Sequence, residues 1–261
     1  MPIIDKLISA YRMEGIDICT GLASHDFGNL PSAPFTRFVK DGRSMTGGLG
    51  IALQEIYLLE NLFGAYRPRH VLIIGNSLGW STLAIAMPLP DSQIAAMDAG
   101  FDENAPYGLD LTNRMAASAG LDKVRAVKGA SSQDVAGVVD AELDGRVDFA
   151  LIDGLHTNEQ VVLDYEAIAR KAARDAVYLF HNVYALNFTK GSHRLSTWPA
   201  ARRKTCGQRH PVWRSFMSNA LPLMKPHGLL LERHTGNGVE RRPASPWRGA
   251  SLSSCTGCGG H

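Results

Sequence analysis

One stretch of the sequence combines small residues with a spacing that suits cofactor binding. Residues 71–86 read VLIIGNSLGWSTLAIA, so an apolar run ends at Gly75 and apolar residues restart with helical spacing after Gly79. This pattern predicts a strand, a tight turn and a helix. Because neither glycine has a side chain, a ligand can approach the backbone, and the N–H groups that open the helix are free to bind polar or anionic atoms. The stretch favours a nucleotide-like cofactor, with an ordinary tight turn as the alternative.

The spacing of the glycines indicates which cofactor to expect. The dinucleotide fingerprint is G-x-G-x-x-G, whereas this turn reads G-x-x-x-G and has Ser77 in place of the middle glycine. A nicotinamide-dependent oxidoreductase therefore becomes the weaker alternative.

The same turn resembles the first motif of class I S-adenosylmethionine (SAM)-dependent methyltransferases, in the branch that methylates oxygen atoms of small molecules. That motif reads roughly V-L-E-I-G-x-x-x-G-x-S-T, and the residues that match it here are Gly75, Gly79, Ser81 and Thr82. Ile73 stands where the family usually has an acidic residue, so one polar tether for the cofactor is missing. The resemblance implies SAM as the cofactor and contacts to it from Gly75, Asn76, Ser77, Gly79 and Ser81.

The next predicted strand ends at Asp98. A carboxylate at this place can accept hydrogen bonds from both hydroxyl groups of a ribose. We therefore expect Asp98 to bind the ribose of the cofactor, with Ala99 beside it, and either the following backbone or the ring of Phe101 to flank the adenosine. The alternative is an aspartate that only caps the loop.

The third strand is followed by Gly129, Ala130 and Ser131. This segment resembles the family's turn beside the adenine, so all three are expected cofactor contacts. Ala130 departs from the family pattern, because a carboxylate often stands there and accepts the adenine amino proton. That contact would pass to Ser131, Ser132 or the backbone, and helix capping by either serine is an equally good interpretation.

The fourth strand ends in the segment IDGLH, which resembles the family's D-x-x-x-I-D-G-x-H segment. Asp153 would lie near the sulfonium of the cofactor or bind a metal beside it, and His156 would face the cleft and contact the cofactor. His156 is the expected catalytic base, because its unperturbed pKa of about 6.5 suits proton transfer near neutrality. His181, after the next strand, is the second candidate.

A divalent cation is an additional expectation at the same rim. In the catechol-type branch the family binds its cation with the first strand-end aspartate and an Asp-Asn pair. Here the corresponding residues are Asp153, His181 and Asn182. This set carries less negative charge than Mg²⁺ usually receives, so the histidine favours a softer metal. A role for His181 in hydrogen bonding alone is the other interpretation.

The segment upstream resembles the part of that branch that closes over the cofactor, with Met45 and Thr46 as expected contacts. Residues 1–40 would form a cap or part of the acceptor site, or alternatively a homodimer contact. Neither role is fixed by the residues.

Strands and helices alternate through the middle of the chain. Helices are expected at 49–66, 80–87, 108–119, 132–139 and 158–172, and strands at 70–74, 93–97, 124–128, 147–152 and 176–180. Such alternation predicts an α/β fold with a doubly wound, mostly parallel sheet, the Rossmann-like fold of methyltransferases. In such sheets ligands bind beyond the carboxyl ends of the strands, which is where every residue discussed above would lie.

Composition divides the chain into three parts: residues 1–40, a SAM-binding catalytic domain at 41–189, and a basic extension at 190–261. The extension holds 12 Lys and Arg against 2 Asp and Glu, and its apolar periodicity fades. We favour a poorly ordered segment there, with zinc binding by Cys255 and Cys258 as a weaker alternative, and we do not expect nucleic-acid binding.

The chain has no apolar run of about 18 residues and no signal-peptide pattern, and its four cysteines are scattered. We therefore expect a cytoplasmic protein without a membrane partner. Together these features predict an enzyme that methylates an oxygen of a hydroxylated small molecule. A non-catalytic cofactor-binding protein on the same fold is the remaining alternative.

Overall fold

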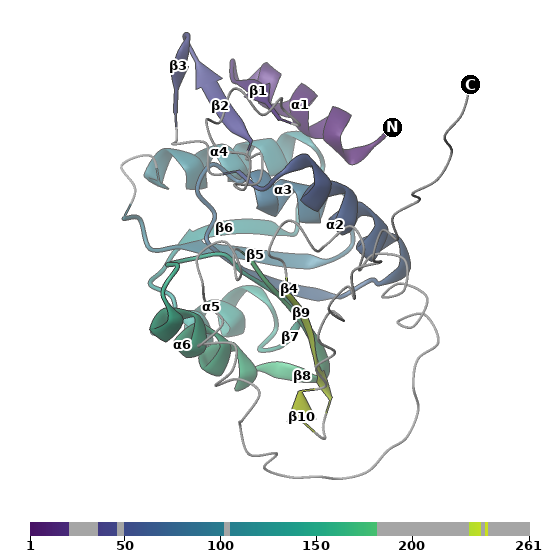
Figure 1. The fold of residues 1–261 in the computed structure, drawn as a ribbon, viewed down its shortest axis with the longest axis vertical. Helices are drawn as coiled ribbons and strands as arrows, with labels where there is room; N and C mark the ends of the chain where they lie inside the picture. Colours follow the sequence, from purple (N-terminus) through teal and green to yellow (C-terminus); the bar gives the residue numbers. More distant parts are fainter. Residues whose placement is uncertain (21–35, 46–49, 102–104, 182–229, 236–237, 240–261) are drawn as a thin grey trace, which may run out of the picture.

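The computed structural model describes residues 1–20, 36–45, 50–101, 105–181, 230–235 and 238–239. Its central feature is a seven-stranded sheet in the order β10-β9-β8-β7-β4-β5-β6 (Figure 1). The strands span β4 His70–Ile74, β5 Gln93–Asp98, β6 Val124–Lys128, β7 Val147–Ile152, β8 Ala172–Phe180, β9 Leu230–Thr235 and β10 Gly238–Val239.

Five neighbouring strands of this sheet, β6, β5, β4, β7 and β8, are parallel. The helices between them are α3 Trp80–Ala86, α4 Ala105–Ser118, α5 Val135–Glu142 and α6 Asn158–Ala169. Each parallel neighbour needs a crossover connection, and these helices provide it. The expected doubly wound, mostly parallel α/β fold is confirmed.

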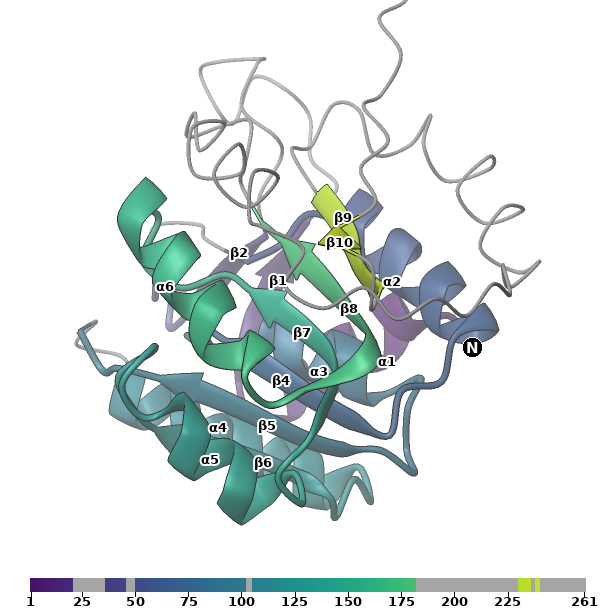
Figure 2. The ribbon, with the colours of Figure 1, turned by 90° about the horizontal axis from the view of Figure 1, so that it is seen from below.

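The helices cover both faces of the sheet. Helices α3 and α4 share one face with α1 Ile3–Met13 and α2 Leu53–Ala65, while α5 and α6 cover the other (Figures 1 and 2). Alternate residues of β4 divide accordingly: Val71 and Ile73 pack into the first core, and Leu72 and Ile74 into the second. Burial on both faces explains why the strands read as continuous apolar runs.

The strand order reverses between β4 and β7, because β5 and β6 extend the sheet on one side and β7 and β8 on the other. In doubly wound sheets this reversal opens a crevice at the carboxyl ends of the two central strands. Residues after Ile74 and Ile152 therefore occupy the place where a ligand is expected.

The N-terminal part adds a small antiparallel sheet of β1 Asp17–Cys19, β2 Arg37–Lys40 and β3 Arg43–Ser44. Tyr11 of α1, Phe38 of β2 and Trp80 of α3 form an aromatic cluster with ring centroids 5.4–5.7 Å apart. The Tyr11 hydroxyl also donates to the Leu78 carbonyl oxygen at 2.7 Å. Residues 1–20 are thus anchored behind the glycine turn, and a role in the acceptor site stays a prediction.

Two strands come from the segment that we expected to be a C-terminal extension. Strand β9 pairs antiparallel with β8, and β10 pairs antiparallel with β9. The boundary after residue 189 stays a prediction, but the sheet draws on residues from both sides of it. None of the helices in the described part of the chain is long and apolar enough to cross a membrane.

Candidate functional site

The turn after β4 is held close to the turn after β7. Gly75 has φ +94°, and a Cβ atom at this position would lie 2.1 Å from the main-chain oxygen of Asp153. The Gly75 N–H donates to the Met97 carbonyl oxygen, and the Asp153 N–H donates to that of Ile74. Only glycine fits here, so the backbones of the two central turns approach each other at the crevice.

Asp98 organises the glycine-containing loop. Its Oδ2 atom accepts hydrogen bonds from the main-chain N–H groups of Asn76 at 3.1 Å and Ser77 at 2.9 Å, and its Oδ1 atom accepts one from Gly100 at 2.9 Å. This is the loop-capping role that we named as the alternative. A carboxylate has about four lone-pair directions, so Oδ1 retains one for a ligand hydroxyl and the two roles are compatible.

The side chain of Asn76 points into the protein. Its Oδ1 accepts from the hydroxyl of Thr82 at 3.0 Å, and its Nδ2 donates to the hydroxyl oxygen of Thr112 at 3.1 Å. Gly79 packs against the same Thr112, and Ser81 is buried. Among these predicted contacts, the backbone of the loop is therefore what a cofactor can reach, while the side chains stabilise the turn.

The loop after β6 is supported by α6. The Nε2 atom of Gln160 donates to the carbonyl oxygen and the hydroxyl of Ser131 at 3.4 and 3.3 Å, and to Oδ1 of Asp164 at 2.7 Å. The main-chain N–H of Ala130 donates to the carboxylate of Asp134. Asp134 is the N-cap residue of α5 and makes no side-chain capping hydrogen bond to the helix, so the capping role expected of Ser131 or Ser132 is not seen. A Cβ on Gly129 would meet the Met97 side chain at 3.1 Å.

The remaining predicted cofactor contacts lie around the same rim or outside the described residues. Ala99 follows Asp98 and is half-buried, and Phe101 two residues later is 88% exposed. Met45 packs partly against the core next to β3, whereas Thr46 lies outside the described residues.

Four titratable side chains lie in a row of consecutive contacts that runs from the core to the rim. Oδ1 of Asp153 lies 3.2 Å from Nε2 of His156 and 2.7 Å from Nδ1 of His181. Nε2 of His181 lies 3.1 Å from Oε1 of Glu55 on α2. His181 and Glu55 are buried, Asp153 is mostly buried and His156 is half-exposed, so only the His156 end faces solvent.

These contacts set the charges of the buried members. Burial acts against the charged form of His181, but Asp153 and Glu55 on either side outweigh it and raise the pKa of His181 well above its usual value. Burial would likewise raise the pKa of Asp153, but His181 and His156 outweigh burial and lower it. Asp153 and His181 therefore form a pair of opposite charges in the core.

The expected metal ligands are only partly brought together. Asp153 and His181 meet, and Asn182 lies outside the described residues. His156, which we had expected to act as the base, places its Nε2 atom in the same group. Two imidazole nitrogens and one carboxylate oxygen are a donor set that fits a divalent transition metal.

Three residues that support this site were not predicted to have a role. Glu55 lies in the first turn of the largely apolar helix α2, and Gln160 and Asp164 lie on α6. A buried glutamate among apolar residues is a signal that the sequence does carry, because charged side chains are rarely buried without a partner. The identity of that partner is visible only in the fold.

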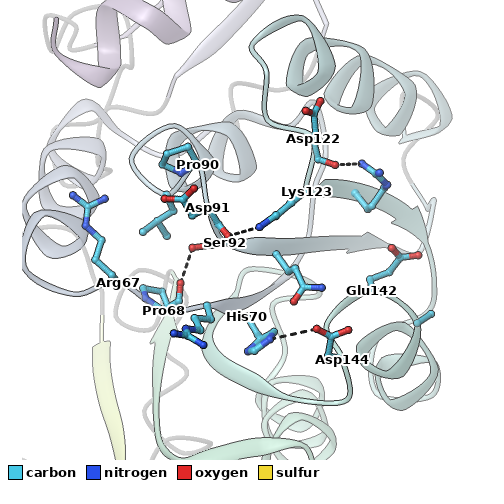
Figure 3. Close-up of a pocket in the computed structure, with 15 residues that line it drawn as sticks. Arg67, Pro68, His70, Pro90, Asp91, Ser92, Asp122, Lys123, Glu142 and Asp144 are labelled. Carbon is cyan, nitrogen blue, oxygen red and sulfur yellow. Dashed lines mark hydrogen bonds and ion pairs between the residues drawn. The ribbon is translucent and has the colours of Figure 1, made fainter.

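A separate hollow lies elsewhere on the described part of the chain. A depression of about 990 Å³ opens at the amino ends of β4, β5 and β6, remote from the strand ends that carry the site (Figure 3). Basic residues such as Arg67 and Lys123 line it together with acidic ones such as Asp91 and Glu142. The mixed charge gives no preference for one class of ligand.

Comparisons with known proteins agree with this architecture. Residues 72–183 match the model of a family described as a methyltransferase domain. A methyltransferase from Geobacter sulfurreducens is similar in structure, with a TM-score of 0.50, 16% identity, and 90% of this chain and 89% of the other covered. Cofactor-bound Rv0187 from MTB gives a TM-score of 0.51 at 19% identity, covering 77% of this chain and 80% of that protein.

No curated protein sequence matches the chain. At these identities the solved structures support the fold, and the family model adds the domain type over the segment from β4 to the end of β8. This segment contains the glycine turn, Asp98, Asp153 and His181. Residues 72–183 thus match a methyltransferase domain, and the described part of the chain shares the Rossmann-like α/β fold of these solved structures.

Proposed function

We propose that this chain is a SAM-dependent methyltransferase that methylates a hydroxyl oxygen of a small molecule. The observation that carries the proposal is the convergence of Gly75, Asp98 and Asp153 at the carboxyl ends of three adjacent strands, β4, β5 and β7. A small cofactor with a ribose and a cationic centre suits this place, because it offers a glycine-containing turn, a partly free carboxylate and a second carboxylate within one crevice.

Each part of the cofactor has a candidate partner. The methionine end would lie along the turn at Gly75. Oδ1 of Asp98 has a lone pair left for a ribose hydroxyl. The loop at Gly129, Ala130 and Ser131, held by Gln160, would face the adenine. Asp153 supplies the negative charge that favours the sulfonium.

When bound, SAM supplies an electrophilic methyl carbon and a thioether leaving group. The acceptor oxygen would bond to that carbon as the carbon–sulfur bond breaks, and the hydroxyl proton would pass to a base on the protein. His156 is the proposed base, because it is half-exposed at the rim and its ring contacts Asp153, which orients it. Desolvation and alignment of the two substrates supply the rest of the rate enhancement.

The decisive experiment offers the full-length protein SAM labelled in its methyl group, together with a panel of phenols, vicinal diols and aliphatic alcohols. We expect label on an acceptor oxygen, identified by mass spectrometry of the product. SAM binding without transfer to any acceptor would favour the non-catalytic alternative. Binding of a nicotinamide cofactor in place of SAM would overturn the proposal.

The cellular setting is part of the proposal. The four cysteines are scattered along the sequence, which fits a reducing compartment, and we propose the cytoplasm. A homodimer formed through the N-terminal segment would be detected by light scattering of the purified protein. Loss of the dimer when exposed residues of α1 are replaced would support this arrangement.

A further inference from the structure

A buried carboxylate of α6 connects the two turns that follow β6 and β7. Asp164 is 0% exposed. Its Oδ1 atom accepts a hydrogen bond from Nε2 of Gln160 at 2.7 Å, and the side chain of Ser131, in the loop after β6, also hydrogen-bonds to this carboxylate. Its Oδ2 atom lies beside the turn after β7, where a Cβ on Gly154 would be 3.8 Å away. Asp164 therefore contacts both walls on this side of the crevice.

The contacts of Gln160 fix which end of its amide group faces the loop. Its terminal nitrogen lies 3.4 Å from the carbonyl oxygen of Ser131, 3.3 Å from the hydroxyl oxygen of the same residue and 2.7 Å from Oδ1 of Asp164. A carbonyl oxygen and a carboxylate only accept hydrogen bonds, so the amide must turn its NH₂ group toward them. Gln160 therefore donates to the Ser131 hydroxyl and does not accept its proton.

These two neighbours set the direction of the Ser131 hydroxyl. A hydroxyl group has one proton and two lone pairs. One lone pair accepts from Gln160, and the proton goes to the Asp164 carboxylate. The second lone pair is left over, and Ser131 is only half-buried. Toward a ligand in the crevice, this hydroxyl is a hydrogen-bond acceptor.

An acceptor at this place can distinguish one purine base from another. Adenine carries an amino group at C6, which donates hydrogen bonds, whereas hypoxanthine carries an oxygen there, which accepts them. Two acceptors that face each other lose their hydrogen bonds to water and gain none in return. Ala130 next to Ser131 has no side chain that could receive the amino group, and its N–H donates to Asp134 at 2.8 Å.

We propose that the Ser131 hydroxyl selects the 6-amino group of the cofactor's adenine, and that Asp164 is the positioning residue that keeps this hydroxyl an acceptor. The inference rests on the proposed function, because that function places the adenine beside the loop at Ser131. It adds the reason why the crevice would choose adenine over a 6-oxo purine, since a site built around one hydrogen bond rejects a ligand that leaves its polar group unpaired.

The test compares two ligands that differ only at C6, using calorimetry on the full-length protein. S-adenosylhomocysteine carries the amino group, and S-inosylhomocysteine carries an oxygen in its place. We expect the wild type to bind the amino compound about 10- to 100-fold more tightly, as one satisfied against one unsatisfied hydrogen bond implies. Ser131→Ala should bring the ratio of the two affinities close to one, because the methyl group accepts from neither ligand.

Asp164→Asn separates positioning from a purely structural role. The amide oxygen of asparagine can still accept from Gln160, but its NH₂ group can donate to the Ser131 hydroxyl, whose proton is then free to turn toward the ligand. The ratio should therefore fall because S-inosylhomocysteine binds more tightly than it does to the wild type. A purely structural role would weaken both ligands equally, and that outcome would overturn the role of Asp164.

Two control variants should keep the wild-type ratio, and thermal unfolding should show that every variant is folded. Gln133→Ala removes an exposed glutamine of the same loop, and Glu159→Gln removes an exposed carboxylate of α6. A ratio lost in Gln133→Ala, or retained in Ser131→Ala at its half-buried position, would overturn the inference and leave the proposed function intact. Binding of neither ligand to the wild type would overturn the proposed function, and this inference with it.

Discussion

Gly75 and Asp153 touch backbone to backbone at the point where the strand order of the sheet reverses. A Cβ atom on Gly75 would lie 2.1 Å from the Asp153 carbonyl oxygen and 2.7 Å from its carbonyl carbon. The two residues directly follow β4 and β7, so this approach defines the floor of the crevice. Any atom added to Gly75 must push one central turn away from the other.

We expect Gly75→Ala to destabilise the protein and to reduce SAM binding. The φ of +94° alone costs an L-residue about 1–2 kcal/mol, and the clash with the Asp153 backbone adds to this. Urea unfolding would measure the first effect and calorimetry with SAM the second. Gly137→Ala is the matched control, because Gly137 is helical and has open space around its Cβ position. This control should raise stability by about 0.5–1 kcal/mol, and equal losses in both variants would contradict the argument.

For Asp98 we expect a loss of cofactor affinity that depends on the ribose. Asp98→Ala should weaken SAM binding by about 1.5–3 kcal/mol, the value of a hydrogen bond to a charged group. Because the carboxylate also holds the N–H groups of Asn76 and Ser77, part of any loss comes from the loop. Comparing ligands with and without the ribose hydroxyls separates the two. Wild type should prefer the hydroxylated ligand, and Asp98→Ala should bind both equally. A preference that survives the substitution would place the ribose elsewhere.

The strands of the central sheet could be predicted from sequence, because apolar runs stop abruptly at Gly75, Asp98 and Asp153. Strand β8 begins at Ala172 and not at 176, since exposed Arg174 and Asp175 interrupt its apolar pattern, and β9 and β10 were not among the expected strands. Helix α2 begins at Leu53 and not at 49, and the Glu55 carboxylate accepts the Ala52 N–H at its start.

The strand-end site residues were predictable for the same reason, since parallel strands bring their carboxyl ends to one edge. The pairing of Glu55 with His181 was not predictable. The two residues lie on different elements far apart in the sequence, and their contact depends on how α2 packs against the sheet. The support of Ser131 by Gln160 is similar, because it depends on where α6 lies relative to the loop after β6.

Loss of the proposed base should affect turnover and spare cofactor binding. We expect His156→Gln to reduce kcat by about 10²–10⁴-fold, the usual contribution of general acid–base catalysis, with little change in the SAM dissociation constant. Single-turnover methyl transfer measures the chemical step. His70→Gln, at the opposite end of the sheet, is the control and should leave kcat unchanged. A normal rate in His156→Gln would exclude it as the base.

The buried carboxylate of Asp164 should make the protein less stable as the pH rises. Burial raises the pKa of Asp164, and the hydrogen bonds from Gln160 and Ser131 only partly offset it. Its Oδ2 atom has no hydrogen bond within the described part of the chain. With the pKa higher in the folded than in the unfolded state, stability is lost as the pH rises from the unfolded pKa through the folded one.

Asp164→Asn removes this titration while it keeps an oxygen that can accept from Gln160. Its free energy of unfolding relative to wild type should therefore increase from acidic to neutral pH and stay constant above the folded pKa. Urea denaturation at a series of pH values measures this difference. Asp122→Asn, at an exposed position, should show no comparable trend. A difference that shrinks as the pH rises would mean that the ionised Asp164 is stabilised by its surroundings, because only a favourable partner can reverse the sign set by burial.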